Sequence, residues 1–203
     1  MPKTPTAQPT TRTRLVTAMS RSLQVRGFGA TSMKDLLDST GVSSGSMYHA
    51  FPGGKEELAA AAVREVGLDA AARIRRVFAA RLTAADGVAT IFAALARDLE
   101  AGGFRFGCPV GVPATEASAA SEGIQIACDE AFDAWIAAYG DALRAEGWDD
   151  DEAVTMALSI VTAYEGAVTI ARARRDTSAI FTISHDLVTR IEAGGRPTTT
   201  EDP

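Results

Sequence analysis

Apolar residues recur every three or four positions along most of the chain, which is the spacing of one face of an α-helix. The first such run contains Leu15, Met19 and Leu23. It stops at Gly27, which has no side chain and suits a helix C-terminus. The pattern predicts a helix over about residues 12–26.

Two short helices are predicted next. In the stretch Thr31-Ser32-Met33-Lys34-Asp35, a hydroxyl three residues before an acid makes a variant capping box, and the helix that it opens ends at Gly41. Ser43 supplies a second hydroxyl cap for a helix to about Ala50, before the breaking sequence Pro52-Gly53-Gly54. Three helices in about forty residues, the last two joined by a tight turn, form a helix-turn-helix layout.

The remainder of the chain is also predicted to be helical. Further helices are expected at about 55–81, 84–101, 109–119, 121–146, 150–173 and 177–193. No segment alternates with period two for long enough to predict a strand. We therefore expect an all-α protein of about nine helices.

Composition divides the chain into four expected parts. Residues 1–11 are rich in Pro and Thr and are expected to form a flexible arm. Residues 12–58 form the helix-turn-helix domain, residues 59–194 form a helical body, and residues 195–203 form a flexible tail. Internal repeats are not evident.

Charge is distributed unevenly between these parts. The chain has 203 residues and a formal net charge of -6, but residues 1–55 hold seven basic and two acidic side chains and therefore carry +5. The remaining residues carry -11. A basic head on an acidic body is typical of a protein in which one end meets a polyanion while the other end stays soluble.

The predicted third helix has two distinct faces. Val42, Met47 and Phe51 are spaced so that they can anchor the helix to the second one. The residues that remain for solvent or DNA are Ser43, Ser44, Gly45, Ser46, Tyr48 and His49. Gly45 costs about 1 kcal/mol relative to alanine inside a helix, and that cost is explained if the backbone there must approach a phosphate or a base edge closely.

This stretch resembles the DNA-binding domain of the TetR family of bacterial transcriptional regulators. In that family a glycine turn, a recognition helix, a Tyr-x-x-Phe anchor and a basic helix start occur in this order, matched here by Gly41, Val42, Ser43, Gly45, Tyr48, Phe51 and Lys55. The string FPGGKEEL and the later Gly107-Cys108-Pro109-Val110 resemble the LmrA/YxaF-type branch. The resemblance is strong over about residues 12–60.

The resemblance implies binding to a double-stranded DNA operator. The implied DNA-binding residues are Thr31, Ser32, Ser43, Ser44, Gly45, Ser46, Tyr48, His49 and Lys55. Many relatives have Lys or Arg where Ser44 stands, so a bidentate guanine contact is not available from this position. Taken singly, Tyr48 could be a core aromatic and His49 an ordinary surface histidine; their occurrence in this order favours DNA binding.

A homodimer is expected because an operator with two-fold symmetry needs two recognition helices. The apolar helix at 150–173 and the last helix are expected to form the interface, as the last two helices do in the TetR family. The expected interface residues are Val154, Leu158, Val161, Ile180, Ile183, Leu187 and Ile191. The alternative is a monomer in which these two helices cover each other.

The family resemblance also implies a small-molecule inducer in a cavity among the middle helices. The candidate ligand-binding residues are Phe92, Phe104, Phe106, Trp135, Tyr139 and Tyr164. Apart from Glu116 and Glu165, few charges are expected there, which favours an apolar or aromatic ligand over an anionic one. Such aromatic stripes are more often simply core.

Other classes of function find little support. The only histidines, His49 and His185, have no catalytic motif around them, so no enzyme is predicted. The acidic run 149–152 is explained by helix capping, and neither a metal nor a cofactor is expected. Cys108 could be a redox switch, although a buried inert thiol is commoner.

A cytoplasmic protein without a membrane segment is expected. The chain start lacks a signal peptide, and two cysteines suit a reducing compartment. The apolar stretch 153–171 contains Glu165 and several hydroxyl residues, which favours a buried helix. The expected function is a repressor that binds a palindromic operator and is released by its ligand. The alternative is an all-α small-molecule carrier that has lost DNA binding, and a gel shift separates the two.

Overall fold

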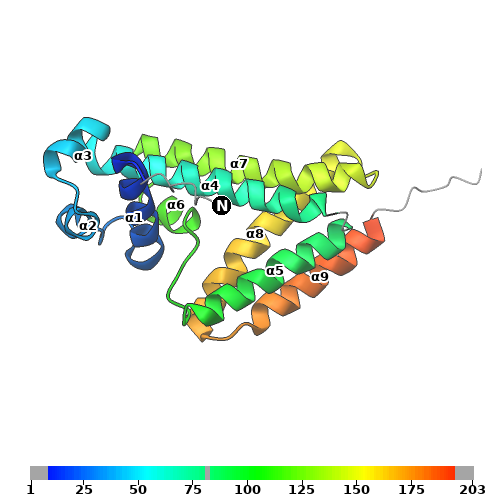
Figure 1. Cartoon of the computed structure of the whole chain (residues 1–203). Helices are drawn as coiled ribbons and strands as arrows, with labels where there is room; N and C mark the ends of the chain where they lie inside the picture. The colour runs from blue at the N-terminus through cyan, green and yellow to red at the C-terminus, as the bar shows by residue number, and fades with distance from the viewer. Residues whose placement is uncertain (1–8, 81–82, 195–203) are drawn as a thin grey trace, which may run out of the picture.

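The all-α prediction is confirmed. The computed structural model describes residues 9–80 and 83–194, and within these ranges it has nine helices and no strand (Figure 1). The helices are α1 (Thr11–Arg26), α2 (Met33–Thr40), α3 (Ser44–Ala50), α4 (Gly54–Ala79), α5 (Ala84–Ala101), α6 (Gly111–Glu116), α7 (Glu122–Ala145), α8 (Asp150–Arg174) and α9 (Ser178–Gly194). Most of the expected flexible arm and all of the expected tail lie outside the described residues.

Local signals set the limits of the three N-terminal helices. The Ser32 hydroxyl accepts a hydrogen bond from the Asp35 amide, and the Ser43 hydroxyl accepts one from the Ser46 amide, so both serines are N-caps. Gly41 ends α2 with φ +62°, a left-handed conformation that glycine adopts without strain. The short helices begin and end where the sequence predicts.

The head formed by α1, α2 and α3 has its own small core. Six of its large side chains are buried: Leu15, Met19, Leu23, Leu36, Met47 and Phe51. They come from all three helices, and α1 also packs along the start of the body on α4. The recognition helix is therefore held from behind by apolar contacts.

The body is built from two helix pairs joined by α8. Helices α4 and α7 lie side by side, α5 and α9 form a second pair, and α8 crosses between the pairs (Figure 1). The approach of α4 to α7 is close at Gly67, where an added side chain would collide with Ala131. The carbonyl of Gly67 also accepts a 2.8 Å hydrogen bond from the buried Trp135 indole.

Helix α8 is long and apolar enough, by length and composition alone, to cross a membrane. In the fold it packs against α7 and α9 and contributes Ala157, Ile160 and Val161 to the core. Packing within the chain therefore accounts for part of its apolar character, and Val154, Leu158 and Ile170 of the same helix remain exposed.

Helix α6 is shorter than predicted. The sequence predicts about 109–119, whereas the helix spans Gly111–Glu116. Residues 108–110 form a turn before it, in which the Cys108 sulfur accepts a hydrogen bond from the Gly111 amide. After it, the Ala117 carbonyl accepts hydrogen bonds from the Ala120 and Ser121 amides and closes another turn.

Candidate DNA interface and ligand pocket

The front of α3 is a surface of small side chains. Ser43, Ser44, Gly45 and Ser46 are all exposed. The Ser43 hydroxyl donates a 2.9 Å hydrogen bond to the Ser46 hydroxyl. As the N-cap of α3, it also accepts a hydrogen bond from the Ser46 amide. No atom lies within 4 Å of the position that a Gly45 side chain would take, so this part of the helix is open to a large partner.

The back of α3 is fixed to the rest of the head. Val42, Met47 and Phe51 are buried, as the sequence predicts. The Arg12 guanidinium lies 4.6 Å from the centre of the Phe51 ring and covers it from solvent. This packing explains how a helix of seven residues can hold a defined orientation.

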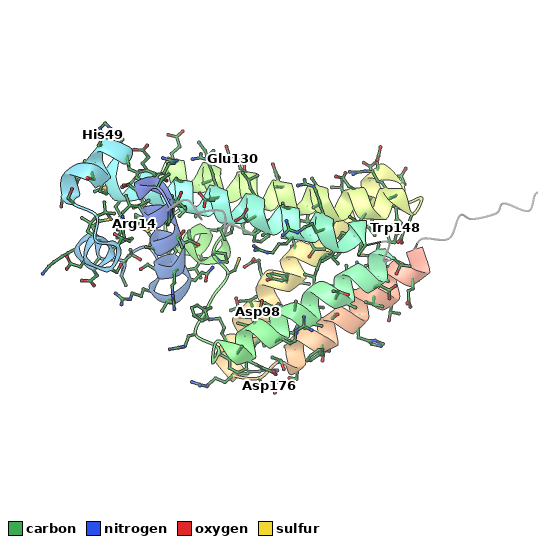
Figure 2. The ribbon with its side chains drawn as sticks, viewed as in Figure 1. Arg14, His49, Asp98, Glu130, Trp148 and Asp176 are labelled. Carbon is green, nitrogen blue, oxygen red and sulfur yellow. The ribbon has the colours of Figure 1, made fainter. Side chains whose placement is uncertain are left out.

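Two larger side chains flank the serine surface. Tyr48 is 58% exposed, which excludes the core-aromatic interpretation of this residue. His49 is also exposed and lies at the far end of the head, distant from Asp98 in the body (Figure 2). Both residues are free to meet a ligand outside the protein.

Lys55 lies at the start of α4, next to the turn that follows the recognition helix. Its ammonium nitrogen is 4.4 Å from the centre of the Phe28 ring, and partial burial lowers the pKa of this lysine. Lys55 therefore packs against the α1–α2 loop in the free protein.

Thr31 does not belong with the exposed set. It is 3% exposed, its hydroxyl donates to the Gly27 carbonyl at 2.6 Å, and that hydroxyl also lies 2.8 Å from the Ser22 hydroxyl. Both of its hydrogen-bonding partners are internal, so Thr31 shapes the loop before α2. Ser32, which is exposed, keeps the position at the helix N-terminus.

The body contains an aromatic pocket between α4, α5, α7 and α8. Its volume is about 270 Å³, and three of the six predicted ligand residues line it: Trp135, Tyr139 and Tyr164. Burial raises the pKa of both tyrosines, so their phenols stay neutral at physiological pH. The pocket can offer ring faces and neutral hydroxyls to a ligand.

The other three predicted ligand residues lie elsewhere. Phe92 is fully buried and packs edge-to-face on Tyr164, with ring centres 5.8 Å apart, so it supports the pocket wall from behind. Phe106 lines a neighbouring pocket of about 300 Å³ beside Gln24 of α1, which shares Leu95, Asp98 and Tyr164 with the aromatic pocket. Phe104 follows α5 with φ +58° and lines neither the aromatic pocket nor the pocket that Phe106 lines.

The charged residues of the ligand pocket differ from those predicted. Arg73 from α4 and Asp98 from α5 both line it, while Glu116 and Glu165 do not. Glu116 lies at the junction with the head, where its carboxylate accepts a 2.8 Å hydrogen bond from the Phe28 amide. Sequence periodicity could not find Arg73 and Asp98, because each lies among exposed positions of its own helix.

The predicted dimer residues divide into buried and exposed groups. Four have almost no surface left within one chain and therefore cannot contact a partner: Val161, Ile180, Leu187 and Ile191. The three on α9 are covered because α9 packs along α5, and Val161 faces the aromatic pocket. Ile183 is half-buried.

An apolar surface nevertheless remains on the last two helices. Val154 and Leu158 are 45% and 51% exposed on α8, as expected for interface residues. Phe181 on α9 and Ile170 on α8, which are not among the predicted interface residues, are 53% and 44% exposed. Large exposed apolar side chains on neighbouring helices are typical of an interaction surface.

Cys108 is an unreactive thiol in this environment. Burial and the nearby charge of Glu165 raise its pKa, which disfavours the thiolate needed for oxidation. Cys128 is buried as well, and both cysteines are free. The redox interpretation of Cys108 therefore has no support in its surroundings.

A helix-turn-helix head with an exposed recognition helix, joined to a helical body with an aromatic pocket, defines a DNA-binding transcriptional regulator. The family described as bacterial regulatory proteins, tetR family, matches residues 15–62, and the transcriptional regulator LmrA/YxaF-like C-terminal domain matches residues 84–186. The chain belongs to the TetR family, in the LmrA/YxaF-like branch, and its family comprises transcriptional regulators and not enzymes.

Individual relatives agree with this placement. The HTH-type transcriptional regulator LmrA of Bacillus subtilis is 28% identical over 173 residues, which cover 85% of this chain and 92% of the relative. An uncharacterized HTH-type regulator of Mycobacterium tuberculosis is 30% identical over 185 residues, covering 87% of this chain and 91% of the relative. A TetR transcriptional regulator from Legionella pneumophila has the same fold, with a TM-score of 0.81 and 21% identity. The match covers 91% of this chain and 99% of that structure.

Proposed function

We propose that the protein is a homodimeric repressor in the cytoplasm that binds a palindromic operator and is released by a small, largely apolar or aromatic ligand. The observation that carries the proposal is the exposed surface of Ser44, Gly45 and Ser46, backed by the buried Met47. A helix with a small polar front can enter the major groove, where hydroxyls and backbone reach base edges and phosphates.

Dimer formation is supported by the exposed apolar side chains of the last two helices. Leu158 and Phe181 expose about half of their surface, and Val154 and Ile170 extend the apolar area along α8. A two-fold axis through this surface would leave the two heads free. The two recognition helices would then meet successive major grooves, about 34 Å apart.

Ligand binding is supported by the aromatic pocket. A volume of about 270 Å³ suits a molecule of one or two rings, stacked against Trp135 and Tyr139. Arg73 and Asp98 at the wall add a place for one polar substituent. The pocket adjoins α4, which also carries Lys55 beside the head, so a ligand that favours one position of α4 would change the spacing of the recognition helices.

The DNA-binding test compares variants at the front of α3 in a gel shift with the DNA upstream of the protein's own gene. Ser46→Trp fills the groove-facing surface and should abolish binding, while sedimentation should still find the wild-type oligomer. Gln125→Trp, a change of similar size on the exposed face of α7, should bind as wild type. A carrier that has lost DNA binding would shift no DNA in the wild-type form.

The dimer test uses charges at the apolar surface. Leu158→Glu combined with Phe181→Glu should halve the mass in sedimentation and weaken operator binding. Leu68→Glu is the matched control, because Leu68 is 62% exposed on α4 and lies away from the last two helices. A wild-type mass for the double variant would contradict the proposed interface.

The pocket test uses toluene and p-xylene as neutral aromatic probes, which do not absorb where tryptophan is selectively excited. In a Trp148→Phe background, Trp135 is the only tryptophan, so its fluorescence reports on the pocket. Both probes should change this fluorescence in a saturable way, and Ala94→Phe, which fills the pocket wall without adding a tryptophan, should prevent the change. Unchanged fluorescence in the unfilled pocket would contradict an aromatic ligand.

A further inference from the structure

Unsatisfied polar atoms gather in one place outside the aromatic pocket. Among the described residues, the buried side-chain atoms without a hydrogen-bond partner are Trp148 Nε1, Glu165 Oε1 and Arg172 Nε. The last two line the same pocket, although they are a carboxylate acceptor and a guanidinium donor. Buried polar atoms are usually paired, so one unpaired acceptor atom and one unpaired donor atom at the same pocket indicate a missing partner.

This pocket lies between the end of α1, helix α6 and helix α8, and its volume is about 880 Å³. It shares no lining residue with the aromatic pocket. Cys108, Val112 and Phe132 give it apolar walls, and Thr162 and Thr169 add hydroxyls on α8. It is large enough to hold a metabolite-sized molecule.

The two unpaired groups are on one face of α8. Glu165 and Arg172 are seven residues apart, which is nearly two full helical turns and about 10.5 Å along the axis. Val168, between them in the sequence, also lines the pocket. The site therefore has an acidic end, an apolar middle and a basic end.

The surroundings hold each group in place, and among the described residues neither group has an oppositely charged partner. Burial raises the pKa of Glu165, and a cationic partner would favour its charged form. At the acidic end, the Glu165 carboxylate lies against Gly111, where an added side chain would collide with it, and beside the Cys108 thiol. At the basic end, the Arg172 guanidinium donates through Nη2 to the Arg105 carbonyl at 3.5 Å. The described residues form five ion pairs, and neither Glu165 nor Arg172 belongs to any of them.

We propose that this pocket binds a small zwitterion, with an ammonium group at Glu165 and a carboxylate at Arg172. Both contacts would be charge-assisted hydrogen bonds, which are the strong kind. An apolar linker between the two charged groups would pack on Val168 and Cys108.

A ligand in this pocket would touch the head and the body together. Gln24 and Gly27, at the end of α1, line the pocket along with Glu116, whose carboxylate binds the Phe28 amide. The site adjoins the contact between the two parts of the chain, and the pocket that Phe106 lines lies between it and the aromatic pocket. This proposal stands independently of the operator and of the aromatic ligand.

The test measures binding of ω-amino carboxylic acids with three to eight carbons to the full chain by calorimetry, without DNA. Affinity should peak at one chain length, because both ends must reach their partners. Diamines and dicarboxylates of that same length should bind at least tenfold more weakly. This comparison uses only the wild-type protein and does not depend on any variant folding.

Variants then assign the two ends. Glu165→Gln and Arg172→Gln should each weaken the best amino acid at least tenfold, while Glu152→Gln and Arg174→Gln, exposed on the same helix, should not. If none of these amino acids binds, the proposal is overturned. That result would also be expected if a second copy of the chain occupied the pocket. Equal binding of diamines or dicarboxylates, or unchanged affinity in both pocket variants, would overturn it as well.

Discussion

The Glu116 carboxylate accepts a 2.8 Å hydrogen bond from the Phe28 amide and so joins the body to the head across 88 positions of the sequence. The contact is tight, because a side chain at Gly27 would collide with the same carboxylate. A second link runs nearby, where the Gly107 amide donates to the Gln24 carbonyl at 2.9 Å. The end of α1 is therefore fixed to the loop and helix that precede α7.

Glu116→Ala should loosen this junction without unfolding the protein. The carboxylate is exposed, so its loss should reduce the free energy of unfolding by about 1 kcal/mol or less. Hydrogen exchange at the Phe28 amide should become faster by about tenfold, because its acceptor is gone. Glu122→Ala, at an exposed acid in the first turn of α7, should leave that exchange rate unchanged. An unchanged rate in Glu116→Ala would mean that other contacts hold the loop.

Lys55→Ala should weaken binding to every DNA sequence by a similar factor. The slope of log affinity against log salt should become shallower by about one unit for each phosphate contact that is lost, and each bound subunit would lose one such contact. Lys55→Arg, which keeps the charge and can still lie over Phe28, should restore most of the slope. Gel shifts over a series of salt concentrations measure it. A wild-type slope in the alanine variant would leave Lys55 with only its contact to the ring.

The head follows from the sequence almost residue by residue because its signals are local. Ser32, Gly41 and Ser43 each act on the backbone within a few positions, and each does so where the sequence predicts. The inward anchors Met47 and Phe51 follow from helical spacing alone. Thr31 is the exception, because its sequence context is equally consistent with an exposed hydroxyl at the helix start and with a buried hydroxyl bonded to Gly27.

The body is less predictable because periodicity shows which face is apolar and not which neighbour covers it. Ile180 and Leu187 have the spacing of an interface, but α5 from the same chain covers them. Phe181, the residue after Ile180, is exposed on the opposite face of α9. Arg73 and Asp98 reach the aromatic pocket from helices that meet only in three dimensions.

Raising the pH should destabilise the protein through its buried tyrosines. Burial raises the pKa of Tyr139 and Tyr164 above the unfolded value of about 10. Above pH 10 the unfolded chain therefore loses these protons while the folded chain keeps them, and stability falls as pH rises, by up to about 1.4 kcal/mol per pH unit for each group. Urea unfolding at pH 9, 10 and 11 measures the slope.

The double variant Tyr139→Phe with Tyr164→Phe separates these groups from the rest of the protein. It removes both phenols and keeps the rings, so its stability should fall less steeply between pH 10 and 11. Buried Cys108 contributes in the same direction and is present in both proteins. Parallel curves for the wild type and the double variant would show that the two phenols do not govern alkaline stability.

Gly45→Ala should stabilise the free protein and weaken its binding to DNA. Gly45 lies inside α3 with no atom within 4 Å of an added side chain, so alanine fits and restricts the unfolded chain, worth about 0.4 to 1 kcal/mol. On DNA the same methyl group would occupy the space that the glycine leaves for a phosphate or base edge, and the operator affinity should fall at least tenfold.

Gly123→Ala is the matched control, because Gly123 also lies near a helix start with open space around it and belongs to the body. It should give a similar gain in denaturant unfolding and wild-type affinity in a gel shift. A gain in stability with lost affinity at position 45 alone would show that this glycine serves contact with DNA. Wild-type affinity of Gly45→Ala would instead mean that the recognition helix does not approach DNA closely at this point.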